Sequence, residues 1–375
     1  MKAVQYRVFG STGEMVSILG MGAMRLPIIN NDPSVIDVSQ AISLLRYGID
    51  SGINYIDTAF TYHKQESEKI VGLALKGSYR KKVKIATKLP VWYMEKATDF
   101  ERIFSEQLRR LDTDYIDFYL LHGLNREKWT KALQLDVLNS ISQKKKAGYI
   151  KHIGFSFHGD FDLFQEIIHS YKEWEFCQLL LNYVVNNRDL GIDELNIAAQ
   201  NKLGISIMEP LLGGRLANLP LHIMKYYPLN IEPVEAALAW LWNKREVNVV
   251  LSGMSNLEQL KANIEFATHY SSQILSEGDL SQLESVAKLF RQSSLVNCSG
   301  CGYCLPCTAN IDIPNIFEIY NMSAYDLNAK YQYKNLTDNA AACVRCNACV
   351  KRCPQSINIP DILDDIHSSL GKIKH

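Results

Sequence analysis

The spacing of the cysteines limits the folds open to this chain more than any other feature. Eight of the nine cysteines follow residue 297, and only Cys177 precedes it. They form two groups, with the spacings C-x2-C-x2-C-x2-C and C-x2-C-x2-C-x3-C-P: Cys298, Cys301, Cys304 and Cys307, then Cys343, Cys346, Cys349 and Cys353. Because cysteines seldom pair as disulfides in a reducing compartment, this local density indicates metal binding.

The second group, which ends at Pro354, has the spacing of bacterial ferredoxins. Two-residue gaps wrap the backbone so that three thiolates converge on one cubane, while the fourth cysteine points toward a partner cluster. Structural zinc sites instead use two separated C-x2-C pairs. The first group is one residue shorter and has Thr308 where proline is usual. The sequence therefore predicts two [4Fe-4S] clusters, with these eight cysteines as ligands.

A short internal repeat supports two clusters. Cys307 is followed by Ile-Asp-Ile-Pro at 311–314, and Cys353 by Ile-Asn-Ile-Pro at 357–360, at the same offsets. This pseudo-twofold pattern is typical of a two-cluster ferredoxin. We predict crosswise ligation: Cys298, Cys301 and Cys304 share a cluster with Cys353, and Cys343, Cys346 and Cys349 share one with Cys307. Ligation within each group is the alternative.

The part of the chain before the cysteines alternates between short β-like runs and amphipathic helical stretches. The expected strands are Ser17–Met21, Ile53–Asp57, Val83–Lys88, Tyr115–Leu121, His152–Ser156, Phe176–Leu180, Ile205–Met208 and Val247–Leu251. Such alternation implies a parallel sheet with helical crossovers. Eight units in about 250 residues favour a closed (β/α)8 TIM barrel over an open sheet. No G-x-G-x-x-G follows the first strand, which disfavours a Rossmann fold.

The expected domain organisation follows from these patterns. Residues 1–272 form the barrel, residues 273–296 a connecting helix, and residues 297–375 a small ferredoxin-like iron–sulfur domain. The segment Tyr6–Gly13 reads as a hairpin that plugs the barrel floor.

The composition of the chain limits which binding partners we expect. Acidic and basic residues balance at 40 each, so the chain has no net field to attract nucleic acid or an anionic membrane. The N-terminal residues lack the apolar core of a signal peptide, and no apolar run is long enough for a membrane span. We expect a cytoplasmic protein that acts on a small molecule, without nucleic acid or membrane partners.

Four polar residues fall at or just after the ends of consecutive predicted strands, where barrels carry their chemistry. Asp57 ends the second strand, Tyr62 follows five residues later, Lys88 ends the third, and His122 follows the fourth. Each alone has an ordinary structural explanation, but together they indicate a site. A lysine that ends an apolar run needs a counter-ion, and Asp57 is the natural partner.

Carbonyl reduction is the chemistry that suits this group. Hydride addition places negative charge on the carbonyl oxygen, so a proton donor must lie beside it. A free tyrosine has a pKa near 10, and a neighbouring ammonium lowers that pKa because it stabilises the phenolate. The expected roles are therefore Tyr62 as general acid, Lys88 as the group that tunes it, Asp57 as the anchor of Lys88, and His122 as the group that polarises the carbonyl.

Three segments resemble the aldo/keto reductase superfamily, in the same order along the chain: Gly52–Tyr62, Ile85–Lys88 and Asp114–His122. The resemblance implies the Asp57, Tyr62, Lys88 and His122 tetrad, a barrel fold and a nicotinamide cofactor. With its cysteine-rich tail, the chain resembles a prokaryotic branch of aldo/keto reductases that carries a ferredoxin-type C-terminus.

The resemblance also implies cofactor contacts. Ser156 and Gln178 would hold the carboxamide, Gly213, Gly214 and Arg215 the pyrophosphate, and Ser255, Gln259 and Asn263 the adenosine end. The chain departs from the family pattern at Met208, where an aromatic residue is common, and at Phe157, where asparagine is usual. The segment Ser252–Asn263 resembles the adenosine-end motif of the potassium-channel β-subunit branch of the family. No basic residue lies in the turn 253–256, so NADP(H) is expected only from the resemblance to that branch, and NAD(H) stays open.

The sequence thus predicts an NAD(P)H-dependent enzyme that reduces an aldehyde or ketone to an alcohol. The alternative is a redox-sensing or electron-transfer protein that binds nicotinamide and iron–sulfur clusters with little carbonyl turnover. No flavin signature is present to split a hydride into single electrons. Structural support, redox sensing and docking to a redox partner protein all remain open as roles of the clusters.

Overall fold

The computed structural model of this chain describes residues 4–30, 32, 35–185, 191–227, 230–326 and 328–371. The chain divides into two compact units: Met1–Pro210 with Glu235–Leu275, and Leu211–Val234 with Ser276–His375. The domain boundaries expected from the sequence, after residues 272 and 296, stay a prediction. In the part of the chain that the structure describes, no helix combines the length and the apolar character needed to cross a bilayer.

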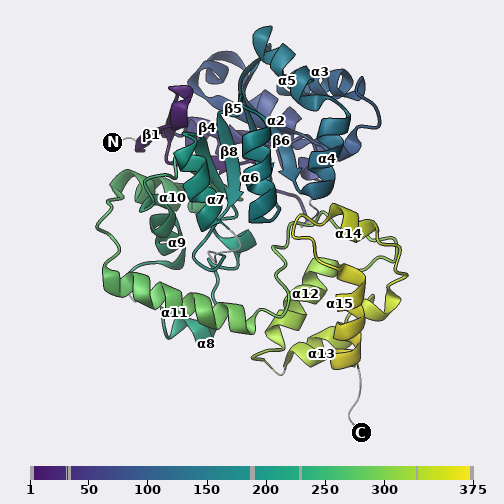
Figure 1. Cartoon of the computed structure of the whole chain (residues 1–375). Helices are drawn as coiled ribbons and strands as arrows, with labels where there is room; N and C mark the ends of the chain where they lie inside the picture. The colour runs from purple at the N-terminus through teal and green to yellow at the C-terminus, as the bar shows by residue number, and fades with distance from the viewer. Residues whose placement is uncertain are drawn as a thin grey trace. The chain divides into compact units, whose positions relative to one another are not determined.

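Eight parallel strands close into a barrel in the first unit (Figure 1). They are β3 (Leu19–Gly22), β4 (Tyr55–Asp57), β5 (Lys84–Leu89), β6 (Ile116–Leu124), β7 (Ile150–Phe157), β8 (Phe176–Leu180), β9 (Gly204–Met208) and β10 (Val249–Ser252). Neighbouring strands pair in chain order, and β10 closes the ring by pairing with both β9 and β3. This arrangement confirms the predicted (β/α)8 barrel.

Helices follow the strands and cover the barrel, as Figure 1 shows for α2 to α6. The helices of this unit are α1 (Val38–Asp50), α2 (Ser67–Ala74), α3 (Asp99–Leu111), α4 (Arg126–Gln134), α5 (Val137–Lys146), α6 (Phe161–Ser170), α7 (Ile192–Gln200), α9 (Pro233–Trp242) and α10 (Leu257–His269). Helix α3 illustrates why they form: its apolar face buries Ile103, Phe104 and Leu111, while Asp99 and Glu101 oppose the positive end of the helix dipole.

The N-terminal hairpin lies at the barrel floor. Strands β1 (Tyr6–Val8) and β2 (Met15–Ser17) pair antiparallel, and a 3-10 turn joins them. Phe9 is fully buried, and its ring makes an edge contact with Phe118 of β6, with ring centroids 5.0 Å apart. The hairpin therefore fills the base of the barrel with aromatic side chains.

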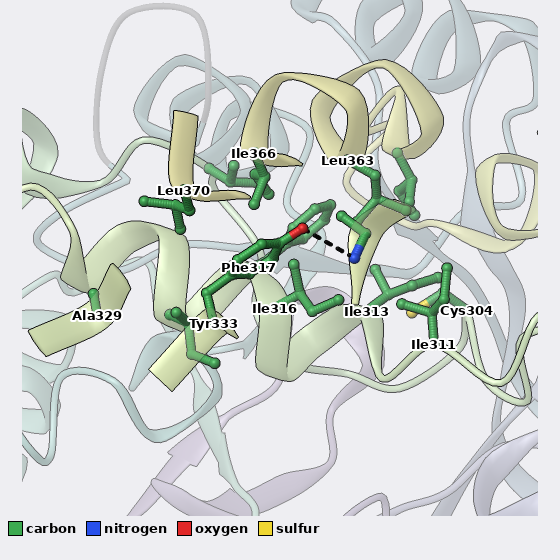
Figure 2. Close-up of a cluster of buried hydrophobic side chains, with 14 residues drawn as sticks. Cys304, Ile311, Ile313, Ile316, Phe317, Ala329, Tyr333, Leu363, Ile366 and Leu370 are labelled. Atoms are coloured by element: carbon green, nitrogen blue, oxygen red, sulfur yellow. Dashed lines mark hydrogen bonds between the residues drawn. The ribbon is translucent and has the colours of Figure 1, made fainter. Parts of the chain in front are cut away.

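The second unit is helical. It contains α8 (Leu221–Met224), α11 (Glu277–Ser293), α12 (Ile313–Met322), α13 (Asn328–Lys334), α14 (Ala348–Arg352) and α15 (Ile359–Ile366). Its core gathers buried side chains from α12, α13 and α15, among them Ile316, Phe317, Tyr333, Leu363 and Ile366 (Figure 2).

The two Ile-x-Ile-Pro repeats start corresponding helices of this unit. Ile313 and Ile359 are buried at the first positions of α12 and α15, and each is followed by a proline within the first turn. Proline is favoured there because its fixed φ suits a helix start and no intrahelical bond is lost. The internal repeat of the sequence is thus also a structural repeat.

Candidate active site and cluster site

The carboxyl ends of β4, β5 and β6 bring the predicted tetrad together. Asp57 is the last residue of β4, Lys88 lies in β5, and His122 lies in β6. Tyr62 begins the short helical turn Tyr62–Gln65 after β4. All four side chains are buried.

The Lys88 amine is the centre of the hydrogen-bond network. Its Nζ donates to the two carboxylate oxygens of Asp57 at 2.6 and 2.7 Å, and to the carbonyl oxygen of Thr58 at 2.9 Å. It also lies 3.1 Å from the hydroxyl oxygen of Tyr62. Lys88 is fully buried, so this ion pair is held away from bulk water.

Burial and charge oppose each other in this pair. Burial lowers the pKa of Lys88, and the adjacent Asp57 carboxylate opposes that shift. Likewise, burial raises the pKa of Asp57, and Lys88 opposes that shift. An ammonium in contact with the Tyr62 hydroxyl stabilises the phenolate, which makes the phenol a better proton donor.

His122 faces Tyr62 from the next strand. Their ring centroids are 5.9 Å apart in an edge-on arrangement, and His122 Nδ1 is buried with no hydrogen-bond partner among the described residues. Burial lowers the pKa of His122 well below its ordinary value, and the positive charges of Lys88 and Lys128 add to the shift. The imidazole is therefore neutral at physiological pH and can hydrogen bond to a carbonyl oxygen.

The backbone after Tyr62 is unusual. His63, Lys64 and Gln65 all have left-handed φ values, of 48°, 50° and 76°. The amide of Leu26 donates to His63 Nε2 at 3.1 Å, which ties this turn to the loop after β3. The sequence gives no sign of this bend, because none of the three residues is a glycine.

A second buried network, which was not predicted from the sequence, lies behind Lys88. Glu68 Oε1 of α2 accepts from Thr87 Oγ1 at 2.6 Å and from Gln107 Nε2 at 2.8 Å. Gln107 Nε2 also lies 3.1 Å from the carbonyl oxygen of Lys88. Burial raises the pKa of Glu68, and these hydrogen bonds oppose the shift. The sequence did carry one signal for this network. Glu68 is an acidic residue on the same helix face as the apolar residues Val71 and Leu75.

Ser156 and Gln178, expected to hold the carboxamide, are neighbours on β7 and β8, where they are paired in register. Ser156 Oγ accepts from the amide of Gly123 at 2.6 Å. Gln178 is buried, and its Oε1 has no hydrogen-bond partner among the described residues. Because a buried acceptor is costly to leave unpaired, this atom suits the NH2 group of a nicotinamide carboxamide.

The residues expected at the adenosine end lie at the turn from β10 to α10. The amide of Ser255 donates to Gln259 Oε1 at 2.9 Å, and Asn263 is buried. The turn itself carries no basic residue, but the side chain of Arg25 packs against Gly253, where an added Cβ would lie 3.3 Å from it. A basic side chain therefore reaches this turn from the loop after β3.

Gly213, Gly214 and Arg215, expected at the pyrophosphate, belong to the second unit. Both glycines have positive φ, of 69° and 99°, as their residue type allows. Arg215 packs over the ring of Phe290 at 4.7 Å, and its Nη2 donates to Ser294 Oγ at 3.0 Å. Their contact with a cofactor stays a prediction.

Four thiols border one small cavity in the second unit. Its lining includes Cys298, Cys301, Cys304 and Cys353, together with the apolar side chains of Ile313, Pro314, Phe317, Ile357 and Ile359. Among the described residues, no three His, Cys, Asp or Glu side chains converge closely enough for a single metal ion. A cubane needs more widely spaced thiols, and this four-cysteine wall fits such a group.

Of the other four cysteines, Cys346 is exposed, and Cys307, Cys343 and Cys349 are partly buried. The hydroxyl of Thr308 lies 3.4 Å from the sulfur of Cys346. The segment that follows Cys307 is thus in contact with the second cysteine group. This contact mirrors the way in which Cys353 lines the cavity of the first group.

Comparison with known proteins identifies the class. Residues 18–221 match the aldo/keto reductase family, and residues 297–357 match a 4Fe-4S dicluster domain. The chain therefore belongs to the aldo/keto reductase family and carries a C-terminal ferredoxin-type domain, as the sequence predicted.

Similar individual proteins support the family assignment. The chain is 26% identical over 293 residues to probable aldo-keto reductase 1 of Glycine max, covering 68% of this chain and 82% of the relative. It shares the fold of an aldo-keto reductase from Bacillus halodurans in its holo form, with a TM-score of 0.64, 22% identity, and coverage of 76% and 96%. An aldo/keto reductase from Klebsiella pneumoniae in complex with NADP and acetate is 25% identical, with a TM-score of 0.61 and coverage of 76% and 96%.

Proposed function

We propose that this protein reduces an aldehyde or ketone to an alcohol, with Tyr62 as the proton donor. The observation that carries the proposal is the 3.1 Å contact between Tyr62 and the buried, Asp57-paired amine of Lys88. A bound dihydronicotinamide would supply the hydride, which adds to the carbonyl carbon.

The residues of the site would then act as follows. His122 donates a hydrogen bond from its neutral ring, which orients the carbonyl and polarises it. Tyr62 transfers its proton to the carbonyl oxygen as negative charge develops there. Lys88 stabilises the resulting phenolate, and Asp57 holds Lys88 in place.

NADP(H) is the cofactor that we infer. The Klebsiella pneumoniae relative, at 25% identity, is described in complex with NADP. Ser156 and Gln178 would bind the carboxamide, because the unpaired Gln178 Oε1 needs a donor. Arg25, packed against the turn at Gly253, is a candidate partner for the 2′-phosphate.

Tyr62→Phe tests the proposal. We expect NADPH oxidation on a panel of aldehydes and ketones to fall at least about 100-fold, because the proton donor is lost. NADPH binding, followed by its fluorescence, should remain. Tyr149→Phe is the matched control, since Tyr149 is exposed and precedes β7 at the opposite end of that strand from Ser156. Full turnover in Tyr62→Phe would refute the proposed role.

We also propose that residues 297–375 form the cluster-binding domain, with two [4Fe-4S] clusters ligated crosswise by the eight cysteines. The thiols of Cys298, Cys301, Cys304 and Cys353 around one cavity support this arrangement. The dicluster match favours electron transfer or redox sensing as a second candidate function. Anaerobic bleaching of the cluster absorbance by NADPH without a carbonyl compound would support that candidate.

A further inference from the structure

A buried carboxylate lies on the side of β5 opposite to the Lys88 amine. Thr87 and Lys88 are consecutive in β5, so their side chains point to opposite faces of the strand. The Thr87 hydroxyl donates to Glu68 Oε1 of α2 at 2.6 Å, and Glu68 is fully buried. Because the strand lies between them, any effect of Glu68 on the reaction must pass through Lys88.

Hydrogen bonds connect this carboxylate to the backbone of Lys88. Gln107 of α3 donates from Nε2 to Glu68 Oε1 at 2.8 Å, and the same nitrogen lies 3.1 Å from the carbonyl oxygen of Lys88. The Tyr119 hydroxyl donates to Gln107 Oε1 at 2.7 Å, which fixes the orientation of the amide. The network thus ties the main chain of Lys88 to α2, α3 and β6.

The preceding residue of α2 supports another group that contacts the amine. Ser67 Oγ lies 2.9 Å from Thr58 Oγ1 and donates to the carbonyl oxygen of Ala23 at 2.8 Å. The carbonyl oxygen of Thr58 accepts from Lys88 Nζ at 2.9 Å. The first turn of α2 therefore supports both the backbone of Lys88 and one acceptor of its amine.

The contacts of Glu68 suit an ionised carboxylate. Thr87, Gln107 and, at 3.4 Å, the Arg110 guanidinium all donate to it, and an ionised carboxylate only accepts. These contacts oppose the burial that raises its pKa. The resulting charge acts on Lys88. Burial lowers the pKa of the amine, the paired aspartate opposes that shift most strongly, and Glu68 opposes it further.

We propose that Glu68 is a positioning residue: its carboxylate holds the backbone of Lys88 in place and supplies a second negative charge that keeps the amine protonated. The inference rests on the proposed carbonyl reduction, in which a protonated amine makes the Tyr62 hydroxyl a better proton donor. Among the described residues, the other charged or titratable groups that face Lys88 or Glu68 are Asp57 of β4, Tyr62 after β4, Arg110 of α3, and Tyr119 and His122 of β6.

The pH dependence of kcat/KM tests this inference in the full-length, cluster-loaded protein. It is measured with NADPH and 4-nitrobenzaldehyde, which has no titrating group, between about pH 6 and pH 10. Glu68→Gln keeps an acceptor for Thr87 but removes the charge. We expect the alkaline limb of the profile to move to lower pH by at least about 0.5 pH unit, because loss of a nearby negative charge favours the deprotonated forms of both Lys88 and Tyr62. Glu68→Asp keeps the charge, so its limb should stay at the wild-type pH although its kcat falls.

Glu106→Gln is the control, because Glu106 also pairs with Arg110, at 2.7 Å, but is partly exposed on α3. Solvent screens its charge, so its limb should stay at the wild-type pH. If Glu68→Gln does not fold, Glu68→Met combined with Thr87→Val removes the same charge together with the donor that would lose its acceptor. Coincident profiles of the neutral variant and the wild type, or an equal shift in Glu68→Asp, overturn the inference while carbonyl reduction stands. Turnover of no aldehyde or ketone by the wild type counts against both proposals.

Discussion

The buried charge of Lys88 is central to the proposed active site, and removing its partner would also affect the stability of the fold. Asp57 holds the amine through two short contacts in a region closed to water. Deleting one partner of a buried ion pair typically costs about 3–5 kcal/mol, because the other charge is left uncompensated. Tyr62→Phe is therefore the cleaner probe of chemistry, since it leaves the Lys88–Asp57 pair intact.

His122 makes stability dependent on pH. Its folded pKa lies well below the ordinary value because the ring is buried, whereas in the unfolded chain it titrates near 6.5. Below about pH 6.5 the unfolded state binds the extra proton and the folded state does not. The free energy of unfolding should therefore fall as pH decreases, by up to about 1.4 kcal/mol per pH unit from this residue.

Denaturant unfolding of the wild type and of His122→Asn at pH 7.5, 6.0 and 5.0 measures this effect. The variant should lose less stability between pH 7.5 and 5.0 than the wild type. His169→Asn is the control for the loss of a histidine as such, because His169 is exposed on α6. Equal acid sensitivity in His122→Asn and the wild type would contradict the prediction.

At the scale of elements, the sequence predicted every barrel strand but not every strand end. The run predicted as Tyr115–Leu121 is β6, which continues to Leu124 with a register shift after Leu121. A buried strand can be identified from its hydrophobic pattern, because that pattern lies in the strand's own side chains. Where the strand stops depends on its partner, and here Leu124 pairs with Phe157 of β7. That information lies 33 residues away along the chain.

The floor hairpin depends on two glycines in different ways. Both Gly10 and Gly13 have positive φ, of 53° and 75°. A Cβ on Gly10 would lie 2.1 Å from the backbone nitrogen of Gly204, whereas a Cβ on Gly13 would meet no described atom within 4 Å. Gly13→Ala should cost about 1–2 kcal/mol from backbone strain alone. Gly10→Ala should cost about 1–3 kcal/mol more, because it also displaces β9.

Denaturant titration followed by tryptophan fluorescence compares the two alanine variants directly. Their ranking is the informative result, since both carry the same backbone penalty. Equal destabilisation would show that the hairpin does not press against Gly204 in solution.

At the scale of the whole molecule, the grouping of the four tetrad residues could be predicted because barrel topology places strand ends side by side. The positions at the ends of strands were enough to predict that Asp57, Lys88 and His122 lie together. Glu68 could not be found in this way, because it lies on a helix that looks like an ordinary amphipathic segment. Its place in the buried network comes from the Thr87 and Gln107 side chains that the tertiary fold brings beside it.

The cysteine arrangement makes a prediction that separates the two ligation schemes. Under crosswise ligation, Cys298 and Cys353 serve the same cluster, so the double alanine variant should keep about half of the wild-type iron and sulfide. Under ligation within each group, the same double variant damages both clusters. The double alanine variant of Cys298 and Cys307 should give the reverse pattern. It should damage both clusters under crosswise ligation, and keep about half of the iron and sulfide under ligation within each group.

Anaerobic iron and sulfide analysis of both double variants decides between the schemes. Crosswise ligation requires the first pair to retain more iron than the second. The reverse order would establish ligation within each group. Because each double variant loses two thiols, a general effect of cysteine removal cannot produce either order.

The three left-handed residues after Tyr62 lower the stability of the fold, but they also fix the backbone beside the Tyr62 hydroxyl group. Each such residue disfavours the fold by about 1–2 kcal/mol, so His63, Lys64 and Gln65 together oppose a considerable share of a typical domain's margin. The surrounding packing must hold this bend against its own tendency to unwind. Glycines at these three positions would remove that cost, but they would also let the backbone beside Tyr62 adopt more conformations. The strained turn thus fixes the position of the hydroxyl group that we propose as the proton donor.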